Sequence, residues 1–318
     1  MAAPIYQRMA MIGCGLIGSS MVRAAREAGA VQQIVVAEAS DFARARVHEL
    51  GLADEVTADV AAAVAGADLV VFAVPVLAMG EAATAAATAM KPGAIVTDVG
   101  SVKGFVAQAL MAALPDNVFI VPGHPIAGTE HSGPDAGFAE LFQSRWVILT
   151  PQPRQDDPYL EAVSQLSEFW RALGANVELM DDRHHDLVLA VTSHLPHLIA
   201  YNIVGTAADM EEVTQAEVMK YSAGGFRDFT RIAASDPTMW RDVFVANKEA
   251  VLEILGRFTE DLQALSRQIR WGESDKLFEL FSRTRDIRRG IIAAGQESAE
   301  PNFGRDHRGP DTPDTKPQ

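Results

Sequence analysis

One segment of the sequence carries a histidine where acid–base chemistry is expected. The segment VPGHPIAGTEHSG, residues 121–133, follows an apolar run and sets His124 between glycine and proline. We expect His124 in a loop at the carboxyl end of a strand, the edge at which α/β sheets bind their ligands. A neutral imidazole there could act as a general base. Thr129 and Glu130 follow within reach of a bound substrate, and we interpret His131 as a solvated neighbour.

A second segment, VTSHLPHLIAYN, combines polar side chains with a helix-bending proline. On a helix, Ser193 and His197 are four residues apart and share a face, whereas His194 points elsewhere. Pro196 removes a backbone hydrogen bond and bends the helix. The bend could direct Ser193 and His197 into a cleft. The alternative is that both are core residues whose polar atoms bond to the backbone.

The histidines do not form a recognisable metal site. The sequence contains no H-E-x-x-H pattern, and no carboxylate is spaced to complete a set of ligands. We predict no metal for the histidines that come into question, which are His184, His185, His194 and His197.

The segment SAGGFRDFTRIAASDPTMWRD, residues 222–242, offers a site for an anion. The forked guanidinium of an arginine matches a carboxylate, and an arginine beside aromatic residues is a natural clamp for one. Arg231 is the best candidate, with Trp240 in the aromatic cluster. Arg227 and Arg241 are interpreted as surface or structural residues.

The segment MIGCGLIGSS has glycines in the order G-x-G-x-x-G between a predicted strand and a predicted helix. Such glycines let a pyrophosphate approach the helix N-terminus, where backbone N–H groups favour anions. Glu38, at the end of the next strand, could bind ribose hydroxyls and would repel a 2′-phosphate, which predicts NAD in preference to NADP. A glycine turn of another kind and a solvated Glu38 are the alternatives. The candidate cofactor contacts in the loop are Gly13, Gly15, Leu16, Ile17 and Gly18.

Two more segments follow predicted strands and should reach the same edge of the sheet. AVPV offers Val74 and Pro75 as cofactor contacts, although a plain turn between strand and helix explains it almost as well. TDVGSVKG offers Ser101 and Lys103. Ser101 could contact the cofactor, or it could cap the following helix.

The elements that position these residues alternate over the first 180 residues. Short runs rich in valine and isoleucine are typical of strands, and amphipathic stretches between them are typical of helices. This alternation predicts a mostly parallel sheet with helices on both faces, a Rossmann-like α/β domain. The expected strands are 8–13, 32–38, 68–74, 93–99, 118–123 and 145–151, and the expected helices include 16–29, 41–50, 76–90 and 103–113.

After about Asp181 the sequence shows long helical periodicity and no convincing strand. We therefore predict an NAD-binding domain at 1–180 and an all-helical domain at 181–295. The polar, proline-rich residues 296–318 cannot bury enough surface to order themselves and are expected to be a disordered tail. The expected helices of the second domain are 183–209, 211–220, roughly 236–270 and 273–292.

The composition fits a two-domain protein that acts on a small molecule. The 318 residues suggest two domains at roughly 150 residues each. A net charge of −15 argues against binding to nucleic acid or anionic lipid. The single cysteine, Cys14, is interpreted as a buried structural thiol. Because we find no signal pattern and no apolar run of about 18 residues, we predict a cytoplasmic protein without a membrane span.

The blocks GHPIAGTE, SHLPH and GGFRDFTRIAASDPTMWRD resemble the prephenate dehydrogenase family of tyrosine biosynthesis, which includes arogenate and cyclohexadienyl dehydrogenases. The resemblance covers about residues 8–292. It implies NAD-dependent oxidative decarboxylation of prephenate to 4-hydroxyphenylpyruvate, and leaves open that of arogenate to tyrosine. It also implies a homodimer formed through the helical domain. We see no fused chorismate mutase region and no C-terminal regulatory domain.

The resemblance implies a role for each matching residue. His124 would hydrogen-bond the C4 hydroxyl of the substrate ring and take its proton as hydride leaves for the nicotinamide, with Ser101 assisting. Ser193 and His197 would line the substrate pocket. Arg231 would anchor the substrate carboxylate.

Three questions stay open at this point. Asp236 could border the substrate side chain and favour the ammonium of arogenate, or it could only cap a helix that starts at Pro237. A rival function is that of a 3-hydroxy acid dehydrogenase with a helical second domain and a catalytic lysine, but Lys220 and Lys248 lie in no glycine-flanked block of that type. A non-catalytic NAD-binding sensor would need a partner surface, and the net charge offers no basic one.

Overall fold

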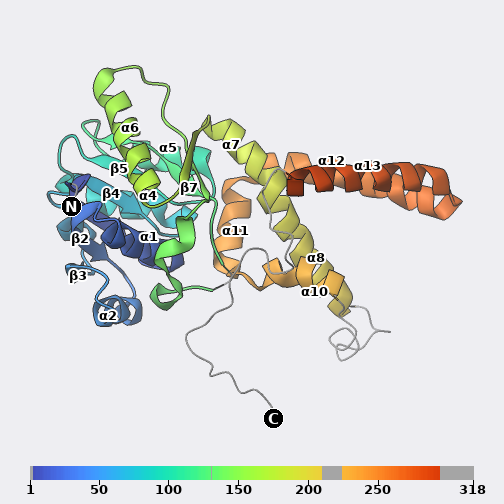
Figure 1. Ribbon diagram of the computed structural model, residues 1–318, viewed down its shortest axis with the longest axis horizontal. Helices are drawn as coiled ribbons and strands as arrows, with labels where there is room; N and C mark the ends of the chain where they lie inside the picture. Colours follow the sequence, from blue (N-terminus) through green and yellow to red (C-terminus); the bar gives the residue numbers. More distant parts are fainter. Residues whose placement is uncertain (1–2, 130, 210–223, 294–318) are drawn as a thin grey trace, which may run out of the picture. The chain divides into compact units, whose positions relative to one another are not determined.

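The alternating segments form a six-stranded parallel sheet in the computed structural model, which describes residues 3–129, 131–209 and 224–293 (Figure 1). The strand order β3-β2-β1-β4-β5-β6 is that of a doubly wound dinucleotide-binding domain. The predicted parallel sheet is therefore confirmed. The strands are β1 (Tyr6–Ile12), β2 (Val31–Ala37), β3 (Glu55–Thr57), β4 (Leu69–Phe72), β5 (Ile95–Asp98) and β6 (Phe119–Ile120).

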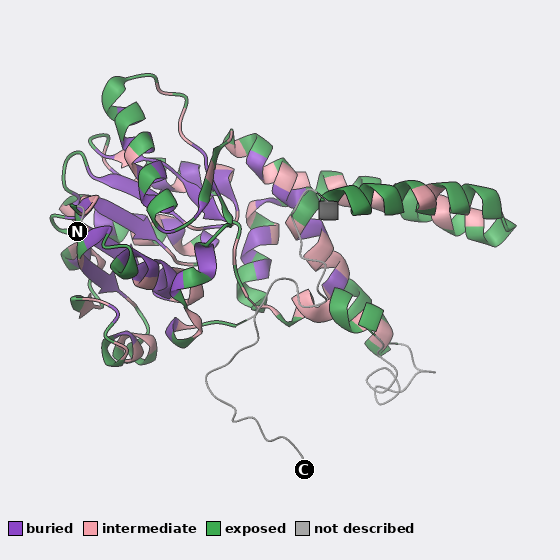
Figure 2. Ribbon diagram, viewed as in Figure 1, coloured by how far each residue is buried: buried purple, intermediate pink, exposed green. Residues whose placement is uncertain are grey.

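Helices cover both faces of this sheet and bury it (Figure 2). Side chains alternate along a strand, so Met9 and Met11 of β1 lie in the core on one face. Ala10 and Ile12 lie in the core on the other face. The helices of this part are α1 (Leu16–Glu27), α2 (Asp41–Glu49), α3 (Val60–Val64), α4 (Met79–Ala86), α5 (Lys103–Ala113) and α6 (Asp157–Ala172).

Three short strands, β7 (Gly123–Pro125), β8 (Trp146–Leu149) and β9 (Asn176–Leu179), form a second sheet. β7 runs antiparallel to β8 and pairs His124 with Ile148. The expectations of one strand over 118–123 and of a loop around His124 are therefore wrong. The reason is Gly123, at which a Cβ would lie 3.1 Å from the carbonyl oxygen of Asp98, so that glycine lets the new strand start close to β5.

The helical part begins with α7 (Asp182–Leu189), the π-helical turn η5 (Ala190–His194) and α8 (Leu195–Asp209). The π-helical turn ends two residues before Pro196, and in it the N–H of Leu195 donates to the carbonyl of Ala190. The predicted bend at Pro196 stays a prediction. The prediction of a single helix at 236–270 is wrong, because the helix is interrupted at Asn247. The remaining elements are α10 (Gly224–Thr230), the 3₁₀ turn η6 (Arg231–Ala234), α11 (Pro237–Ala246), α12 (Lys248–Trp271) and α13 (Ser274–Ala293).

The chain divides into two compact units, residues 1–255 and 256–318. The first unit holds both sheets and the helices up to α11. The boundary falls within α12, and the second unit holds the rest of α12 and α13, which are joined at Gly272, whose φ of 66° suits glycine. The predicted boundary near residue 180 follows the change in secondary structure and stays a prediction. Glu130, the predicted helix 211–220 and the predicted tail 296–318 lie outside the described residues.

One helical run, Asp182–Asp209, is long and apolar enough to cross a membrane by length and composition alone. It carries His185 and His194, both fully buried. Their rings lie within hydrogen-bonding distance of His124 and Asn247. Ionisable side chains are costly in lipid, and these two histidines are instead buried against other parts of the protein.

Candidate functional site

The glycine loop between β1 and α1 forms a cradle for a dinucleotide. Gly13 has a φ of 86°, and a Cβ there would lie 2.6 Å from the carbonyl oxygen of Ala73. A Cβ at Gly18 would lie 2.6 Å from the carbonyl oxygen of Gly13. At Gly15, in contrast, a Cβ would meet nothing within 4 Å. The loop is thus packed on the protein side and open at the N-terminus of α1, which fits the pyrophosphate of NAD.

Glu38 is held beside this cradle. Its carboxylate accepts the N–H of Cys14 at 3.0 Å and the N–H of Ser40 at 3.0 Å. The acid therefore lies beside the glycine loop, and its contact with an adenosine ribose stays a prediction. Burial raises the pKa of the Cys14 thiol to about 12, as expected of the structural thiol predicted from the sequence.

The other candidate cofactor contacts surround the same loop. A Cβ at Gly13 would lie 2.9 Å from Cγ1 of Val74, so Val74 lies against the loop. Pro75, the next residue, is exposed. Leu16 and Ile17 are half-buried in the first turn of α1. These placements bring the candidates together, while the contacts with a cofactor stay predictions.

His124 is buried, with 8% of its surface exposed. Its Nδ1 lies 2.9 Å from Nε2 of His185, a residue 61 positions later on α7. Burial lowers the pKa of His124 well below its usual value of 6.5, and the nearby rings and charge of His185, Lys103 and His194 lower it further. His124 is therefore neutral at neutral pH, the form in which it can accept a proton.

Beneath His124 lies an ion pair between Lys103 and Asp98, both fully buried. Nζ of Lys103 also donates to the carbonyl of Gly123 at 2.6 Å. Asp98 in turn accepts the N–H of Gly123 at 3.1 Å. Burial lowers the pKa of Lys103, and the attraction of Asp98 opposes that shift. The pair fixes both backbone groups of Gly123 and so holds the strand that carries His124.

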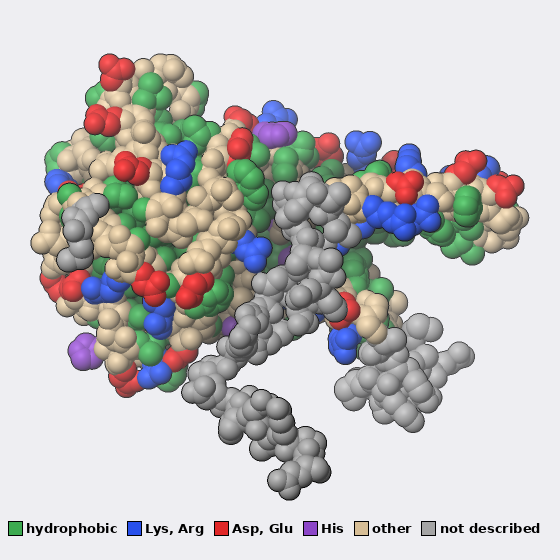
Figure 3. Space-filling model, viewed as in Figure 1, with side chains coloured by type: hydrophobic (Ala, Val, Ile, Leu, Met, Phe, Trp, Pro, Cys, Tyr) green, Lys and Arg blue, Asp and Glu red, His purple; other side chains and the backbone are tan. Residues whose placement is uncertain are grey.

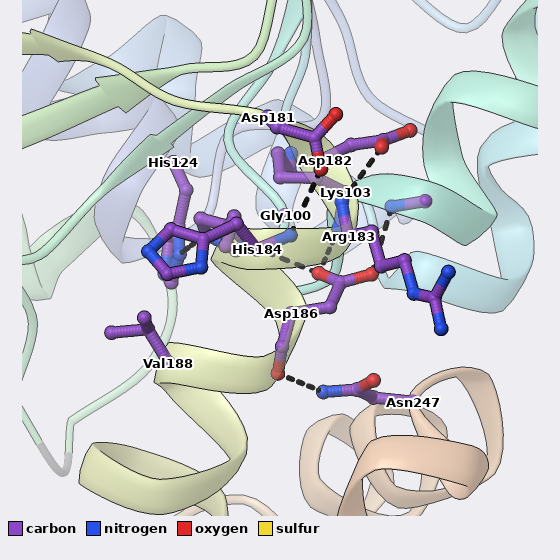
Figure 4. A network of polar contacts seen from close by, with 12 residues as sticks. Gly100, Lys103, His124, Asp181, Asp182, Arg183, His184, Asp186, Val188 and Asn247 are labelled. Carbon is purple, nitrogen blue, oxygen red and sulfur yellow. Dashed lines mark hydrogen bonds and ion pairs between the residues drawn. The ribbon is translucent and has the colours of Figure 1, made fainter.

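Ser101 is half-buried between β5 and α5. It is not the cap of α5, because the N-cap residue is Val102, which makes no side-chain capping bond. The carboxylate of Asp186 takes the N–H groups of Lys103 and Gly104 instead (Figure 4). The hydroxyl of Ser101 is thus not needed for capping, and its role toward cofactor or substrate stays a prediction.

His194, at the end of the π-helical turn, and His197, in the first turn of α8, have different surroundings. Nδ1 of His197 donates to the carbonyl of Ser193 at 2.8 Å, and the ring stacks on Trp240. His194 is fully buried, with Nδ1 3.1 Å from Nδ2 of Asn247. Burial lowers the pKa of His194 to about 4. His197 is half-buried and is the more accessible of the two.

Arg231 begins η6, which packs against α8. The pKa of His197 is lowered chiefly by burial and also by the charge of Arg231, so the two residues lie near one another. Asp236 caps α11 and accepts the N–H of Met239 at 2.9 Å. Arg227 pairs with its neighbour Asp228 at the surface, as the surface interpretation expected.

Thr129 is half-buried, and its hydroxyl accepts the N–H of His131 at 3.2 Å. The next residue, Glu130, lies outside the described residues. No substrate contact of either residue is therefore assigned. In the described parts of the chain no three His, Cys, Asp or Glu side chains are grouped to hold a metal ion, and the prediction of no metal stays a prediction.

His185, Asp186 and Asn247 were not predicted as functional residues from the sequence. His185 was considered only as a metal ligand, yet Nδ1 of His185 lies 2.9 Å from Oδ1 of Asp186. Nδ2 of Asn247 donates to the backbone carbonyl of Asp186 at 2.8 Å (Figure 4). The pair His185–Asp186 at the start of a helix was the available signal, because a carboxylate beside a histidine commonly orients its ring.

Comparisons with known proteins show which family the chain resembles. Residues 21–179 match the family "Prephenate dehydrogenase, nucleotide-binding domain", and residues 181–283 match "Prephenate dehydrogenase, dimerization domain". The chain is 44% identical to cyclohexadienyl dehydrogenase of Zymomonas mobilis, over 89% of this chain and 96% of that one. It is 32% identical to prephenate dehydrogenase of Bacillus subtilis, over 92% of this chain and 78% of that one.

Solved structures show the same fold. Prephenate dehydrogenase from A. aeolicus, in complex with hydroxyphenyl propionate and NAD⁺, matches with a TM-score of 0.82 and 35% identity, over 90% of this chain and 98% of that one. Synechocystis arogenate dehydrogenase matches with a TM-score of 0.74 over 90% of this chain and 100% of that one. Its 24% identity supports the fold alone.

Proposed function

Because the chain belongs to the prephenate dehydrogenase family, we propose that it catalyses the NAD-dependent oxidative decarboxylation of prephenate to 4-hydroxyphenylpyruvate in tyrosine biosynthesis. The observation that carries the proposal is His124, a buried and neutral base held in β7 by the Lys103–Asp98 pair. The cofactor is NAD, for which the glycine loop and Glu38 form the cradle.

The chemistry matches what these residues can do. Bound NAD⁺ would serve as the acceptor of a hydride, which is the hydrogen of C4 together with two electrons. His124 takes the proton of the C4 hydroxyl, which becomes a carbonyl. The bond between C1 and the carboxylate then breaks, its electron pair stays in the ring, and carbon dioxide leaves. Return of a proton to the oxygen gives the aromatic phenol, so the ring gains aromatic stabilisation.

The remaining candidates serve binding in this proposal. Arg231 anchors a substrate carboxylate, a role that suits a cation in a protein of net charge −15. Ser101 assists His124. The other residues proposed to line the substrate pocket are Ser193, His197, Thr129, Glu130, Asp236 and Trp240.

The test is formation of NADH, carbon dioxide and 4-hydroxyphenylpyruvate from NAD⁺ and prephenate. We expect turnover, and kcat/KM should be measured for prephenate and arogenate with NAD⁺ and NADP⁺. The name of the Zymomonas mobilis relative, cyclohexadienyl dehydrogenase, makes arogenate the second substrate to try. NADH formation from 3-hydroxy acids alone would favour the rival dehydrogenase, and NAD binding without any turnover would favour a sensor.

We also propose that the protein is a homodimer formed through its C-terminal helices. Large apolar side chains lie exposed on α12 and α13, some of them visible in Figure 3, and exposed apolar patches commonly mark interaction surfaces. Among them are Leu262, Ile269, Trp271, Phe278, Phe281, Ile287 and Ile291. The match to a dimerization domain over 181–283 supports the same assignment. The proposed compartment is the cytoplasm, where a buried free thiol such as Cys14 persists unpaired.

Light scattering coupled to gel filtration tests the dimer. We expect a dimer for the native chain and a shift toward monomer for Phe278→Glu, since Phe278 is 73% exposed. Phe42→Glu is the matched control, because Phe42 is 80% exposed but lies on α2. A monomeric native chain, or equal effects of the two substitutions, contradicts the proposal.

A further inference from the structure

Three side chains form a chain of polar contacts that leads away from His124. Nδ1 of His124 lies 2.9 Å from Nε2 of His185. Nδ1 of His185 lies 2.9 Å from Oδ1 of Asp186. The two histidines are buried, and the side chain of Asp186 is only 13% exposed. Solvent therefore does not decide which of these nitrogens carries hydrogen.

The last member of the chain fixes the direction of both contacts. Oδ1 of Asp186 accepts the N–H of Lys103 at 2.7 Å, and Oδ2 accepts the N–H of Gly104 at 2.9 Å (Figure 4). A carboxylate surrounded by donors accepts from His185 as well, so Nδ1 of His185 carries the hydrogen. Burial lowers the pKa of His185 below 6.5, so the ring is neutral and its Nε2 is a bare acceptor.

The position of the hydrogen on His185 determines that on His124. Because Nε2 of His185 is an acceptor, Nδ1 of His124 must be the donor. We infer that His185 and Asp186 are positioning residues that fix the tautomer of His124, with hydrogen on Nδ1 and the lone pair on Nε2. Only Nε2 is then free to take a proton. This inference rests on the proposed function, in which His124 is the base that takes the hydroxyl proton.

The same contacts serve the charged state of the ring. When Nε2 of His124 gains a proton, Nδ1 still donates to His185, and the negative charge of Asp186 lies at the end of the chain. Orientation of a catalytic imidazole by a buried carboxylate has the same physical logic in hydrolases. Here a second imidazole lies between the two groups. His185 touches neither substrate nor cofactor in this scheme.

Two substitutions of His185 distinguish its effect on the tautomer of His124 from its effect on packing. His185→Leu removes the acceptor, and we expect kcat for prephenate to fall about 10- to 100-fold, as for other residues that orient a catalytic group. KM should change much less. His185→Gln can present its amide oxygen to Nδ1 of His124 and should recover most of the lost kcat. Thermal unfolding and the Kd for NAD⁺ show whether each variant keeps its fold.

A spectroscopic readout judges the inference without any turnover. In protein labelled with ¹⁵N-histidine, long-range NMR correlations distinguish the two neutral tautomers, and a His124→Asn sample assigns the His124 signals. We expect the Nδ1–H form at pH 7 in the native protein and in His185→Gln. We expect loss of that preference in His185→Leu and a shift toward the other form in Asp186→Asn.

The outcomes separate the two proposals. An Nε2–H tautomer of His124 in the native protein overturns the inference, as does an unchanged kcat in a folded His185→Leu variant. An unchanged His124 signal in Asp186→Asn shows that Asp186 does not influence the tautomer of His124, and it overturns the role inferred for Asp186. Where prephenate is not turned over at all, the proposed function fails, and the NMR spectra still decide whether His185 and Asp186 set the tautomer.

Discussion

The imidazole of His197 stacks on the indole of Trp240, with ring centroids 3.7 Å apart and an angle of 23° between the planes. Nδ1 of His197 is engaged with the carbonyl of Ser193. A carbonyl only accepts, so Nδ1 carries hydrogen and the neutral ring has a bare Nε2. Burial and the charge of Arg231 lower the pKa of His197. The free enzyme therefore offers an acceptor, not a cation, at this nitrogen.

The first prediction is that prephenate binding takes up a proton at His197. A substrate carboxylate at Nε2 favours the doubly protonated ring, so we expect proton uptake on binding near neutral pH and a KM that rises with pH. Titration calorimetry with prephenate, without NAD⁺, in buffers of different ionisation enthalpy measures this uptake. The control is His197→Gln, in which uptake should vanish. Equal heats in all buffers for the native protein contradict the prediction.

The second prediction concerns His124. His124→Asn should lower kcat about 10²–10⁴-fold with a smaller change in KM, as for a base acting in the transition state. Because the pKa of His124 is lowered by burial, His185, Lys103 and His194, its neutral form persists to low pH. The acid limb of kcat/KM for the native enzyme should lie well below pH 6.5. An unchanged kcat, or an acid limb at or above 6.5, would rule out His124 as the base.

The glycine loop and the parallel sheet could be predicted because their signals are local. Strand, glycines and helix N-terminus are contiguous around Gly15, and hydrophobic runs mark the central strands. Short, mostly exposed strands such as β9, over Asn176–Leu179, give no such signal. The break at Asn247 was missed for another reason: its side chain bonds to Asp186 and His194 from another part of the chain.

Individual residues of the candidate site could be predicted from the sequence, but the contacts between them could not. His124, Ser193 and His197 stand out by residue type and spacing. The partner of His124 does not, because His185 is 61 residues away and meets it only through the pairing of β7 and the position of α7. The environment that makes His124 neutral is likewise a property of the folded chain.

The third prediction concerns the choice of cofactor. Glu38 lies at the glycine loop, fixed by the N–H of Cys14, and should repel a 2′-phosphate. We therefore expect a higher kcat/KM with NAD⁺ than with NADP⁺. Glu38→Ser should reduce the difference in kcat/KM between the two cofactors, mainly by raising kcat/KM with NADP⁺. Glu55→Ser, a change at an exposed acid of β3, serves as the control. A native preference for NADP⁺ would make the assignment of Glu38 wrong.

The fourth prediction concerns Arg231. Arg231→Ala should chiefly raise KM, because an anchor holds the ground state and the transition state alike. A hydrogen bond to a charged group is worth roughly 1.5–3 kcal/mol, so we expect a loss of about 10- to 200-fold. Arg227→Ala is the matched control, since that side chain is 74% exposed and paired with its neighbour. An effect confined to kcat is incompatible with anchoring.

The fifth prediction concerns Asp236, five residues after Arg231 in RIAASDP. Its carboxylate caps α11 through the N–H of Met239, and its charge helps to raise the pKa of Tyr201, mainly raised by burial, so it lies near α8 as well. A carboxylate beside the substrate side chain would attract the ammonium of arogenate and do nothing favourable for the keto group of prephenate.

Asp236→Asn keeps much of the capping ability and removes the charge. We expect kcat/KM for arogenate to fall while that for prephenate holds or rises. Thermal unfolding serves as the control. Loss of a cap lowers the free energy of unfolding by about 0.5–2 kcal/mol, and such a loss should affect the kinetics with both substrates alike. Asp236→Ser, which also caps without a charge, should reproduce the shift in specificity. Equal changes for the two substrates leave Asp236 as a helix cap alone, since only a charge acting on the bound side chain can separate an ammonium from a ketone.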